Sequence, residues 1–413
     1  MNNEPGLFFR AYCRSFQGIL RVVSPLLPWR EPLVEEGPGS VLKLVPHMVA
    51  LGLNKILVVT DKGILTLGLA DNLLSAMGEA GITPVVFSDT ATNPTVDNIE
   101  NGVALYKKEA CQGILAFGGG SPIDCGKGIG ARIARPRKTL AQMKGILGVG
   151  RRLPPLFAVP TTAGTGSEVT LAAVVSNPLT HEKYAISDTP LIPRYAALDP
   201  ELILGLPPSI TVATGMDALT HAVEAFIGRS NTGQTAKDAL EAAQLVLENL
   251  PQAYAAGSDM KARQKMLKAA YLAGRAFTRA YIGNVHALAH TLGGFYGVPH
   301  GLANAVLLPL VLEYYRDAVH QPMAEMARRI GVSTDIDDRR AAAEFIEKIR
   351  SLNRAMAIPP SLPGIILEAD IPTMAKRAFA EANPLYPVPA IFGQKDFQTL
   401  LRRVGELAEP AEG

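Results

Sequence analysis

The feature that most constrains the fold is a regular alternation of short apolar runs with amphipathic segments between residues 55 and 160. Buried strands are expected at KILVVT (55–60), PVVF (84–87), GILAF (113–117) and PPLFAVP (154–160), and helices at Gly63–Ala80 and Val96–Ala110. Strands joined by helical crossovers run parallel, and helices then cover both faces of their sheet. The pattern predicts an α/β domain with a mostly parallel, Rossmann-like sheet.

The second half of the chain has a different texture. Two consecutive prolines at 207 and 208 can end one element and begin the next. Beyond them, long Ala- and Leu-rich periodic segments predict helices at Ala213–Ile227, Ala236–Ala255, Lys261–Ala280 and Ala303–Ala318. We therefore expect three parts: a helical N-terminal extension (residues 1–34), an α/β domain (residues 35–206) and an all-helical domain (residues 207–413).

Composition narrows the class of protein. The 413 residues are 48% hydrophobic, and 40 Lys and Arg nearly balance 38 Asp and Glu, so small-molecule chemistry is favoured over a nucleic-acid partner. Only three cysteines are present, without C-x-x-C spacing, which favours a reducing, cytoplasmic location over a disulfide framework. No apolar run reaches the roughly 18 residues of a transmembrane helix.

The N-terminal stretch LFFRAYCRSFQGILRVV mixes Arg10, Arg14 and Arg21 with aromatic and aliphatic residues. It lacks the uninterrupted apolar centre and small-residue cleavage site of a secretory signal. Three interpretations stay open: a helical extension packed on the body or on a neighbouring subunit, a membrane-surface helix, and an organelle transit segment.

A first glycine-rich stretch, GILAFGGGSPIDCGKG, runs from a buried strand through glycines 118–120 into a helix. Ser121 can cap that helix, Pro122 suits its first position, and Asp124 stands where a capping-box acid reaches back. Backbone N–H groups at such a helix start can bind a diphosphate. The stretch is neither a Walker loop nor the G-x-G-x-x-G fingerprint, and a tight turn without a ligand is the alternative.

Two further features lie at the ends of predicted strands. VPTTAGTGSEVT (159–170) consists mainly of small hydroxyl residues and glycines, which could lie under a ligand or form a mobile surface loop. Asp61 follows the strand 55–60, at the edge where open α/β sheets bind ligands. Its carboxylate could accept both ribose hydroxyls and repel a 2′-phosphate, or it could simply cap a helix.

Histidines gather in the helical half. Asp217 and His221 are four residues apart, His286 and His290 repeat that spacing, and His300 follows a Gly-Val-Pro turn. One carboxylate and three imidazoles could hold a divalent transition metal, although exposed pairs or hydrogen-bonded core histidines are the alternative. Neither H-E-x-x-H nor a zinc-finger pattern is present. The remaining histidines are interpreted as surface or core residues: His47, His181 and His320.

Taken together, GGGSPIDCGKG, PTTAGTGSEVT, GMDALTHAVEA and HALAHTLGGFYGVPHG resemble the iron-dependent (group III) alcohol dehydrogenases, in the family's order and spacing. The resemblance runs from about Glu35 to the C-terminus and implies a dehydroquinate synthase-like fold. It implies that Fe(II), or Zn(II) or another divalent metal, is bound by four ligands: Asp217, His221, His286 and His300. It also implies that His290 is a catalytic, proton-relay or substrate-orienting residue.

For the α/β domain the resemblance implies NAD binding. The diphosphate motif comprises Gly119, Gly120, Ser121, Asp124 and Lys127. The positions that line the dinucleotide cleft are Thr161, Thr162, Thr170 and Lys183. Asn93 matches a residue near the adenosine half, and Asp61 matches the position whose carboxylate favours NAD over NADP.

The function that the resemblance implies is reversible hydride transfer between a primary alcohol or aldehyde and NAD, in a cytoplasmic homo-oligomer, a dimer or larger. Alternatives of the same fold are a dehydroquinate synthase-type or glycerol dehydrogenase-type enzyme, and a catalytically silent NAD-binding protein. A synthase would need several Lys and Arg near the metal, whereas the His-rich segment has mainly Ala, Leu and Gly as neighbours. Arg279 stands where many relatives carry Asn, which affects the polarity of the substrate pocket.

Overall fold

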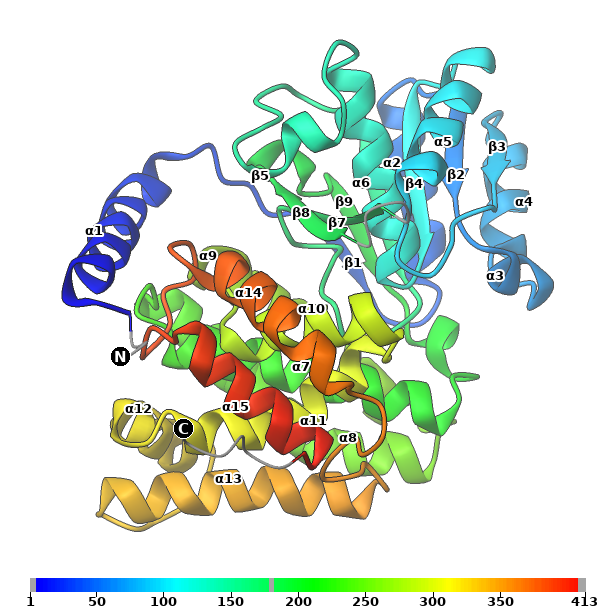
Figure 1. The fold of residues 1–413 in the computed structure, drawn as a ribbon. Helices are drawn as coiled ribbons and strands as arrows, with labels where there is room; N and C mark the ends of the chain where they lie inside the picture. Colours follow the sequence, from blue (N-terminus) through cyan, green and yellow to red (C-terminus); the bar gives the residue numbers. More distant parts are fainter. Residues whose placement is uncertain (1–4, 178–181, 408–413) are drawn as a thin grey trace. The chain divides into compact units, whose positions relative to one another are not determined.

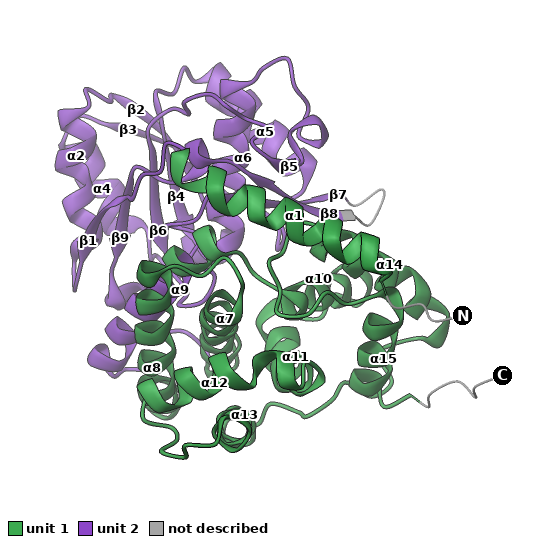
Figure 2. Cartoon of the chain, turned by 90° about the vertical axis from the view of Figure 1, so that its left-hand side faces the viewer, with its two compact units in different colours: residues 1–26, 208–256, 275–413 green, residues 27–207, 257–274 purple. Residues whose placement is uncertain are grey.

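The computed structural model describes residues 5–177 and 182–407, and the chain forms two compact units (Figure 2). Unit 1 comprises Met1–Leu26, Pro208–Ala256 and Arg275–Gly413, and unit 2 comprises Leu27–Pro207 and Gly257–Gly274. Three segments therefore cluster differently from the predicted domains: residues 1–26 and 27–34 of the predicted extension fall in different units, and residues 257–274 leave the predicted helical domain. The N-terminal helix belongs to the helical unit, and residues 257–274 belong to the unit that contains the sheet.

Unit 2 is built on a six-stranded sheet with the order β1-β9-β6-β4-β2-β3 (Figure 1). Every pairing in this sheet is parallel. The strands are β1 (Leu33–Glu36), β2 (Lys55–Val59), β3 (Thr83–Phe87), β4 (Gly113–Gly118), β6 (Leu156–Pro160) and β9 (Tyr195–Leu198). The predicted parallel α/β architecture is confirmed, and the four strands expected from the apolar runs are all present.

Alternation along the strands divides the unit-2 core into two layers. In β2, Leu57 and Val59 belong to one buried cluster and Ile56 and Val58 to the other, because successive side chains point to opposite faces. Helices from the sequence between the strands complete each layer: α5 (Val96–Lys108) and α6 (Gly120–Ala134) in the first, α2 (Leu44–Ala50) and α4 (Asp71–Glu79) in the second. Burial on both faces explains why these strands are continuously apolar.

The helix predicted over 63–80 is broken into α3 (Lys62–Thr66) and α4. Gly68 lies between them with φ +66°, a left-handed conformation that ends the first helix. Unit 2 also contains a second, three-stranded sheet with the order β5-β8-β7. Its strands are β5 (Gly145–Ile146), β7 (Ala172–Asn177) and β8 (Glu182–Ser187), with β7 and β8 antiparallel.

The described residues of unit 1 form helices and connecting loops, without a strand. Its helices are α1 (Leu7–Val23), α7 (Pro208–Ile227), α8 (Gly233–Ala255), α10 (Asn284–Tyr296), α11 (His300–Tyr314), α12 (Asp317–Arg329), α13 (Asp338–Ala355), α14 (Ile371–Ala382) and α15 (Gln394–Gly405). Helix α7 begins at Pro208, where the two prolines were expected to begin a new element, and therefore earlier than the helix predicted over 213–227. The helix predicted over 303–318 is wrong at its end, because Arg316 adopts φ +50° and separates α11 from α12.

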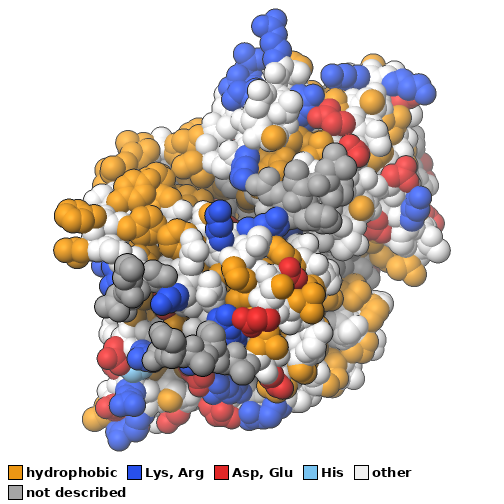
Figure 3. All heavy atoms as spheres, viewed as in Figure 1, with side chains coloured by type: hydrophobic (Ala, Val, Ile, Leu, Met, Phe, Trp, Pro, Cys, Tyr) orange, Lys and Arg blue, Asp and Glu red, His pale blue; other side chains and the backbone are white. Residues whose placement is uncertain are grey.

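Helix α1 is attached to unit 1 through polar side chains. Arg14 donates to the Val388 and Pro389 carbonyls at 2.7 and 2.9 Å, and Gln17 Nε2 donates to the Tyr386 carbonyl at 2.7 Å. The opposite side of α1 is apolar and exposed, and Phe8 is 92% accessible. Figure 3 shows these hydrophobic side chains on the molecular surface. Across the described chain, none of the helices has the length and apolar character needed to span a membrane.

Helix α9 (Met260–Ala280) begins in unit 2 and ends in unit 1. Within unit 2 it packs on the loop after β6 through two glycines. A Cβ atom on Gly166 would lie 2.7 Å from the Gly274 Cα atom, and one on Gly274 would lie 2.9 Å from the Gly166 Cα atom. This close backbone contact explains why residues 257–274 cluster with the sheet.

Candidate metal centre and dinucleotide site

Helix α7 supplies the first two predicted metal ligands. Asp217 and His221 lie one turn apart on it, and both are buried. Nearly every residue from Thr211 to Ile227 is buried, which explains why this helix is apolar around its whole circumference apart from a few polar side chains. Polar groups in such an environment require partners, and the partners come from two other helices.

Helices α10 and α11 bring the next two histidines to Asp217. His286 Nε2 lies 3.7 Å and His300 Nε2 lies 3.5 Å from Asp217 Oδ1. Ligand atoms of Asp217, His221 and His286 all lie within 4.8 Å of one another. The structure therefore brings all four predicted ligands together in unit 1, with His300 joined to the group through Asp217.

Opposite charges lie close together in this cluster. Burial alone raises the pKa of the Asp217 carboxyl, but the imidazoles of His221, His300 and His286 outweigh burial and hold this pKa well below its ordinary value. Burial lowers the pKa of His286, whereas the nearby carboxylates of Asp217 and Glu224 outweigh that effect and raise it to about 9. The carboxylates of Asp217 and Glu224 thus stabilise positive charge at this site.

The donor set fits a divalent metal. Asn304 Nδ2 lies 2.7 Å from Asp217 Oδ1, 3.2 Å from His286 Nε2 and 3.3 Å from His300 Nε2, so three potential ligand atoms face one point. Asn304 Oδ1 is buried and has no hydrogen-bond partner among the described residues. One carboxylate oxygen with imidazole nitrogens suits Fe(II), Zn(II) or Mn(II) and does not by itself choose among them.

His290 lies next to the cluster without joining it. Its Nδ1 atom is 2.6 Å from Glu381 Oε1, which also accepts a hydrogen bond from the Tyr386 hydroxyl at 2.8 Å. The His290 ring stacks on His300 with the centroids 5.1 Å apart. The Nε2 atom of His290 is therefore the ring nitrogen that remains for a substrate or a proton relay.

Three residues that contact the ligands were not singled out from the sequence: Asn304, described above, Glu224 and Phe277. Glu224, on α7, lies with Oε2 2.6 Å from His286 Nδ1. Phe277, on α9, stacks on the His221 ring with the centroids 4.2 Å apart and the planes 17° from parallel. The sequence contains a pattern that could have identified Glu224, because positions 217, 221 and 224 follow the i, i+4, i+7 spacing of one helix face.

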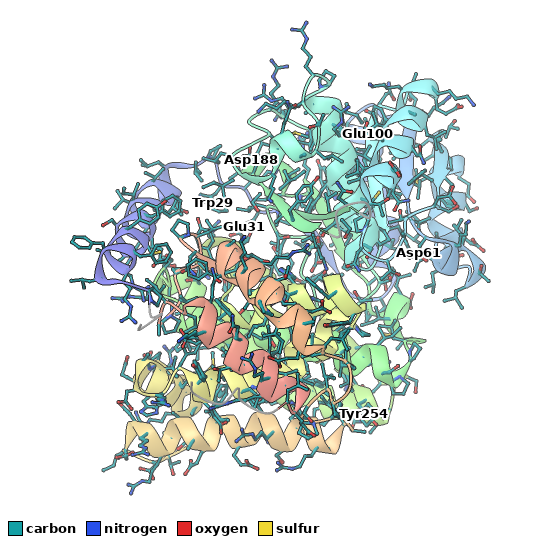
Figure 4. All side chains as sticks on the ribbon, viewed as in Figure 1. Trp29, Glu31, Asp61, Glu100, Asp188 and Tyr254 are labelled. Atoms are coloured by element: carbon teal, nitrogen blue, oxygen red, sulfur yellow. The ribbon has the colours of Figure 1, made fainter. Side chains whose placement is uncertain are left out.

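In unit 2, three predicted cofactor segments share one sheet edge. Strands β6, β4 and β2 are neighbours and parallel, so their carboxyl ends place Thr161, Gly119 and Asp61 along the same edge. Thr161 N donates to the Gly118 carbonyl at 3.0 Å. Asp61, which is labelled in Figure 4, accepts the Ile64 N–H through Oδ1 at 3.0 Å and caps α3. The helix-cap interpretation of Asp61 is confirmed, and its cofactor role stays a prediction.

The capping pattern predicted for α6 is wrong. The helix begins at Gly120 with Gly119 as N-cap, so Ser121 lies inside the first turn. Its hydroxyl accepts the Asn93 N–H at 3.1 Å instead of capping the helix. Asp124 does not reach back to the helix start, because it accepts hydrogen bonds from the Ser167 hydroxyl and from the Val174 N–H.

Lys127 forms a buried structural cation. Its Nζ atom donates to the Ala172 and Thr170 carbonyls at 2.7 and 2.9 Å and contacts the hydroxyls of Thr170 and Ser167. Burial lowers its pKa to about 8 against the opposing effects of Asp124 and Glu168. In this structure Lys127 ties α6 to the segment before β7, and any contribution to the diphosphate stays a prediction.

The remaining predicted residues lie close to that edge or away from both sites. Lys183 Nζ donates to Asn93 Oδ1 at 2.8 Å, and Thr162 lies within 3.3 Å of a Cβ atom built on Gly119. His47 lies 2.9 Å from Glu35 and His320 lies 3.4 Å from Asp317, in agreement with their interpretation as residues outside the sites. His181 lies outside the described residues.

Comparison with known proteins accounts for both units. Residues 33–200 match the family described as iron-containing alcohol dehydrogenase, and residues 211–405 match the C-terminal part of the Fe-containing alcohol dehydrogenase family. The N-terminal helix lies outside both matched regions.

Individual relatives agree with this result. The chain is 42% identical to the 1,3-propanediol dehydrogenase of Citrobacter freundii over 371 residues, which cover 89% of this chain and 95% of that protein. It is 34% identical to the NAD-dependent methanol dehydrogenase of Bacillus methanolicus over 354 residues, covering 84% and 90%. A crystal structure of a 1,3-propanediol oxidoreductase superimposes with a TM-score of 0.87 and 39% identity, covering 92% of this chain and 99% of that one.

Proposed function

Because the chain belongs to the iron-containing alcohol dehydrogenase family, we propose that it uses NAD to interconvert a primary alcohol and its aldehyde. The observation that carries the proposal is the convergence of Asp217, His221 and His286, whose ligand atoms lie within 4.8 Å of one another. These residues come from two helices that are separated in sequence by two others, so local spacing alone does not produce the cluster.

We assign metal binding to Asp217, His221, His286 and His300. A divalent metal supplies Lewis-acid chemistry, which polarises a substrate oxygen and lowers the pKa of an alcohol. Asp217 provides the negative charge of the set, and the buried surroundings keep its carboxylate from being screened by water. Fe(II) is the family's namesake ion, and the same donors accept Zn(II).

His290 is assigned to proton transfer. Its Nδ1 atom is held by Glu381, so the proton that leaves the alcohol would be taken up at Nε2. Imidazole suits this task because its ordinary pKa lies near neutrality. The Tyr386 hydroxyl, bonded to the same Glu381 oxygen, keeps that carboxylate in place.

The cofactor is assigned to the sheet edge of unit 2. Backbone N–H groups at Gly119, Gly120 and Ser121 begin α6 and would receive the diphosphate. Thr161, Thr162 and Asn93 lie at the same edge or contact it, and Lys183 holds Asn93. Thr170, Asp124 and Lys127 would act beneath this surface by fixing the loop. Asp61 would favour NAD by repelling a 2′-phosphate.

Short primary alcohols and diols are the proposed substrates, because the relatives reported above are named for 1,3-propanediol and methanol. We also propose a cytoplasmic homo-oligomer. The buried and unpaired state of Cys13, Cys111 and Cys125 supports a reducing compartment, and the apolar outer side of α1 supports contact with another subunit.

The test combines metal, cofactor and substrate in one assay. The purified chain is loaded separately with Fe(II) without oxygen and with Zn(II), and is then given NAD or NADP with methanol, ethanol, 1-propanol, 1,2-propanediol, 1,3-propanediol or glycerol. Formation of the reduced cofactor is followed by absorbance. Metal-dependent reduction of NAD by at least one primary alcohol is expected. No alcohol-dependent signal from protein that contains stoichiometric metal would contradict the proposal.

A further inference from the structure

We propose that Glu224 is a positioning residue that fixes the tautomer and the orientation of His286, so that the Nε2 atom of this imidazole is presented to the metal. The inference rests on the metal site proposed above and adds a residue that does not itself touch the ligand point. Its support is a set of contacts inside unit 1.

Glu224 is surrounded by three donors. Its Oε2 atom lies 2.6 Å from His286 Nδ1 and accepts the Gly283 N–H at 2.8 Å, while Oε1 accepts the Val285 N–H at 2.8 Å. The side chain is 1% exposed, so water does not compete for these oxygens. A carboxylate in this setting is an acceptor only.

The acceptor role of Glu224 determines the state of His286. Because the carboxylate cannot donate, Nδ1 must carry the hydrogen, and neutral imidazole then has its lone pair on Nε2. Independent support comes from Asn304. Its Nδ2 atom bonds Asp217 Oδ1 at 2.7 Å, which orients the amide, and the same nitrogen lies 3.2 Å from His286 Nε2 as a donor facing that lone pair. A hydrogen bond of this kind to the outer nitrogen is how proteins orient metal-binding histidines.

The same carboxylate attaches α10 to α7. Gly283 is the N-cap of α10 and has no side-chain cap, so Glu224 satisfies backbone N–H groups that a helix start leaves open. A Cβ atom on Gly283 would lie 2.7 Å from Glu224 Oε1. Glu224 also shares the α7 face of Asp217 and His221, at positions i, i+4 and i+7. One helix face therefore carries two proposed ligands together with the residue that orients a third.

The substitution Glu224→Gln tests the proposal with little change in volume. Glutamine has one acceptor oxygen and one amide donor, so at least one of the three N–H groups would face another donor. If the amide NH2 group faces His286, Nδ1 must act as the acceptor and Nε2 must carry the hydrogen. The Nε2 atom then has no lone pair to offer a metal. We expect the affinity of the full-length chain for Zn(II) and for Co(II) to fall about 10–100-fold, measured by competition with a chromophoric chelator.

A second variant perturbs the carboxylate without removing it. Gly283→Ala places a methyl group against Glu224 Oε1. We expect the affinity for the metal to fall about tenfold, the lower end of the effect seen when the hydrogen-bond partner of a metal-binding histidine is disturbed. The visible spectrum of the Co(II) form gives a readout that a change in stability does not move. Loss of one imidazole ligand should change its band positions and intensities in both variants.

The matched control is Asp238→Asn, which neutralises another buried carboxylate in unit 1. Asp238 pairs with Arg275 at 2.6 Å and accepts a hydrogen bond from Gln234 at 2.8 Å, and its hydrogen bonds within the described chain involve none of the proposed ligands. This variant should lose thermal stability and keep the metal affinity and Co(II) spectrum of the parent. The positioning role is overturned if both test variants keep the parent's affinity and spectrum, or if the control weakens metal binding equally. Failure of the parent protein to bind Zn(II) and Co(II) would instead overturn the metal site itself.

Discussion

Asn304 Nδ2 lies 2.7 Å from Asp217 Oδ1, at the point toward which the nitrogens of two histidines also turn. The amide is fully buried on α11, four residues after His300. It therefore gives the Asp217 carboxylate a hydrogen-bond donor when no cation is bound. A bound metal would interact with the same oxygen in place of this donor. The metal-free and metal-loaded proteins should therefore respond differently to the loss of Asn304.

Asn304→Leu should destabilise the metal-free protein more than the metal-loaded protein. Leucine keeps the branching at Cγ but leaves a buried carboxylate oxygen without its donor, which costs about 1–3 kcal/mol. In the metal-loaded form the cation takes over that role. The measurement is the unfolding midpoint of parent and variant with chelator and with excess Zn(II). Equal losses under both conditions would contradict this account of Asn304.

Variants of His286 and His290 should separate ligand from proton carrier. His286→Ala is expected to lose bound metal, because an imidazole is removed from the set. His290→Asn should keep stoichiometric metal and lose about 10²–10⁴-fold in kcat, the usual worth of a general acid or base. Metal analysis and steady-state kinetics on the same preparations decide the question. Metal loss in the His290 variant would place that residue among the ligands.

Asp61 has two roles that can be separated. Asp61→Asn keeps an oxygen that can cap α3 and removes the charge, whereas Asp61→Ala removes both. Each variant should raise the ratio of kcat/KM for NADP to that for NAD by about tenfold or more, the effect of relieving one charge repulsion. Only the alanine variant should lose stability, by about 1 kcal/mol. An unchanged cofactor ratio would leave Asp61 as a helix cap alone.

Much of the architecture was predictable because it depends on local periodicity. The strands β2, β4 and β6 follow from apolar runs, and α7 and α9 follow from helical spacing. The proposed ligands were found because Asp217–His221 and His286–His290 repeat one spacing within apolar surroundings. The predicted helix boundaries were wrong where one residue with a positive φ angle ends a helix, as at Gly68 and Arg316.

Contacts between distant segments were not predictable. Glu224 looks like one acid in an apolar helix, and only the fold reveals that the start of α10 lies against it. The Gly166–Gly274 contact has no local signature, since each glycine could equally serve a turn or a helix. Ser121 and Asp124 fit a capping pattern locally, yet Asn93 and Ser167 compete for them across the fold.

Glu168→Gln should change how stability depends on pH. Burial raises the pKa of Glu168 to about 7, with its own backbone and Lys127 opposing the shift. Since the native state holds this proton more tightly than the unfolded state, the residue makes unfolding free energy fall as pH rises from about 4.5 to 7, by about 3 kcal/mol at most. The free energy of unfolding of the variant, relative to that of the parent, should therefore rise from pH 5 to pH 7.5.

The comparison uses denaturant midpoints at several pH values below 8, where Lys127 is still protonated. The exposed Glu344→Gln substitution on α13 serves as the control and should leave the pH profile unchanged. Parallel profiles for parent and Glu168→Gln would show that the buried carboxyl does not titrate in this range.

Gly166→Ala should separate α9 from the loop after β6. The new Cβ atom would lie 2.7 Å from the Gly274 Cα atom and 2.8 Å from the Ala270 carbonyl oxygen, and both are backbone atoms that cannot rotate away. We expect a loss of stability above about 2 kcal/mol, since strain at φ +60° adds to the collision. The KM for NAD should also rise, because the displaced loop contains Thr161 and Thr162.

The control for backbone strain is Gly39→Ala. Gly39 has φ +68°, close to the value at Gly166, but a Cβ atom there meets nothing within 4 Å. Its loss should therefore be limited to the cost of a left-handed alanine, about 1 kcal/mol, and the KM for NAD should stay constant. Thermal unfolding and NAD titration of both variants measure the difference. If the two substitutions cost the same and neither affects NAD, the contact between Gly166 and Gly274 contributes nothing beyond a permissive backbone angle.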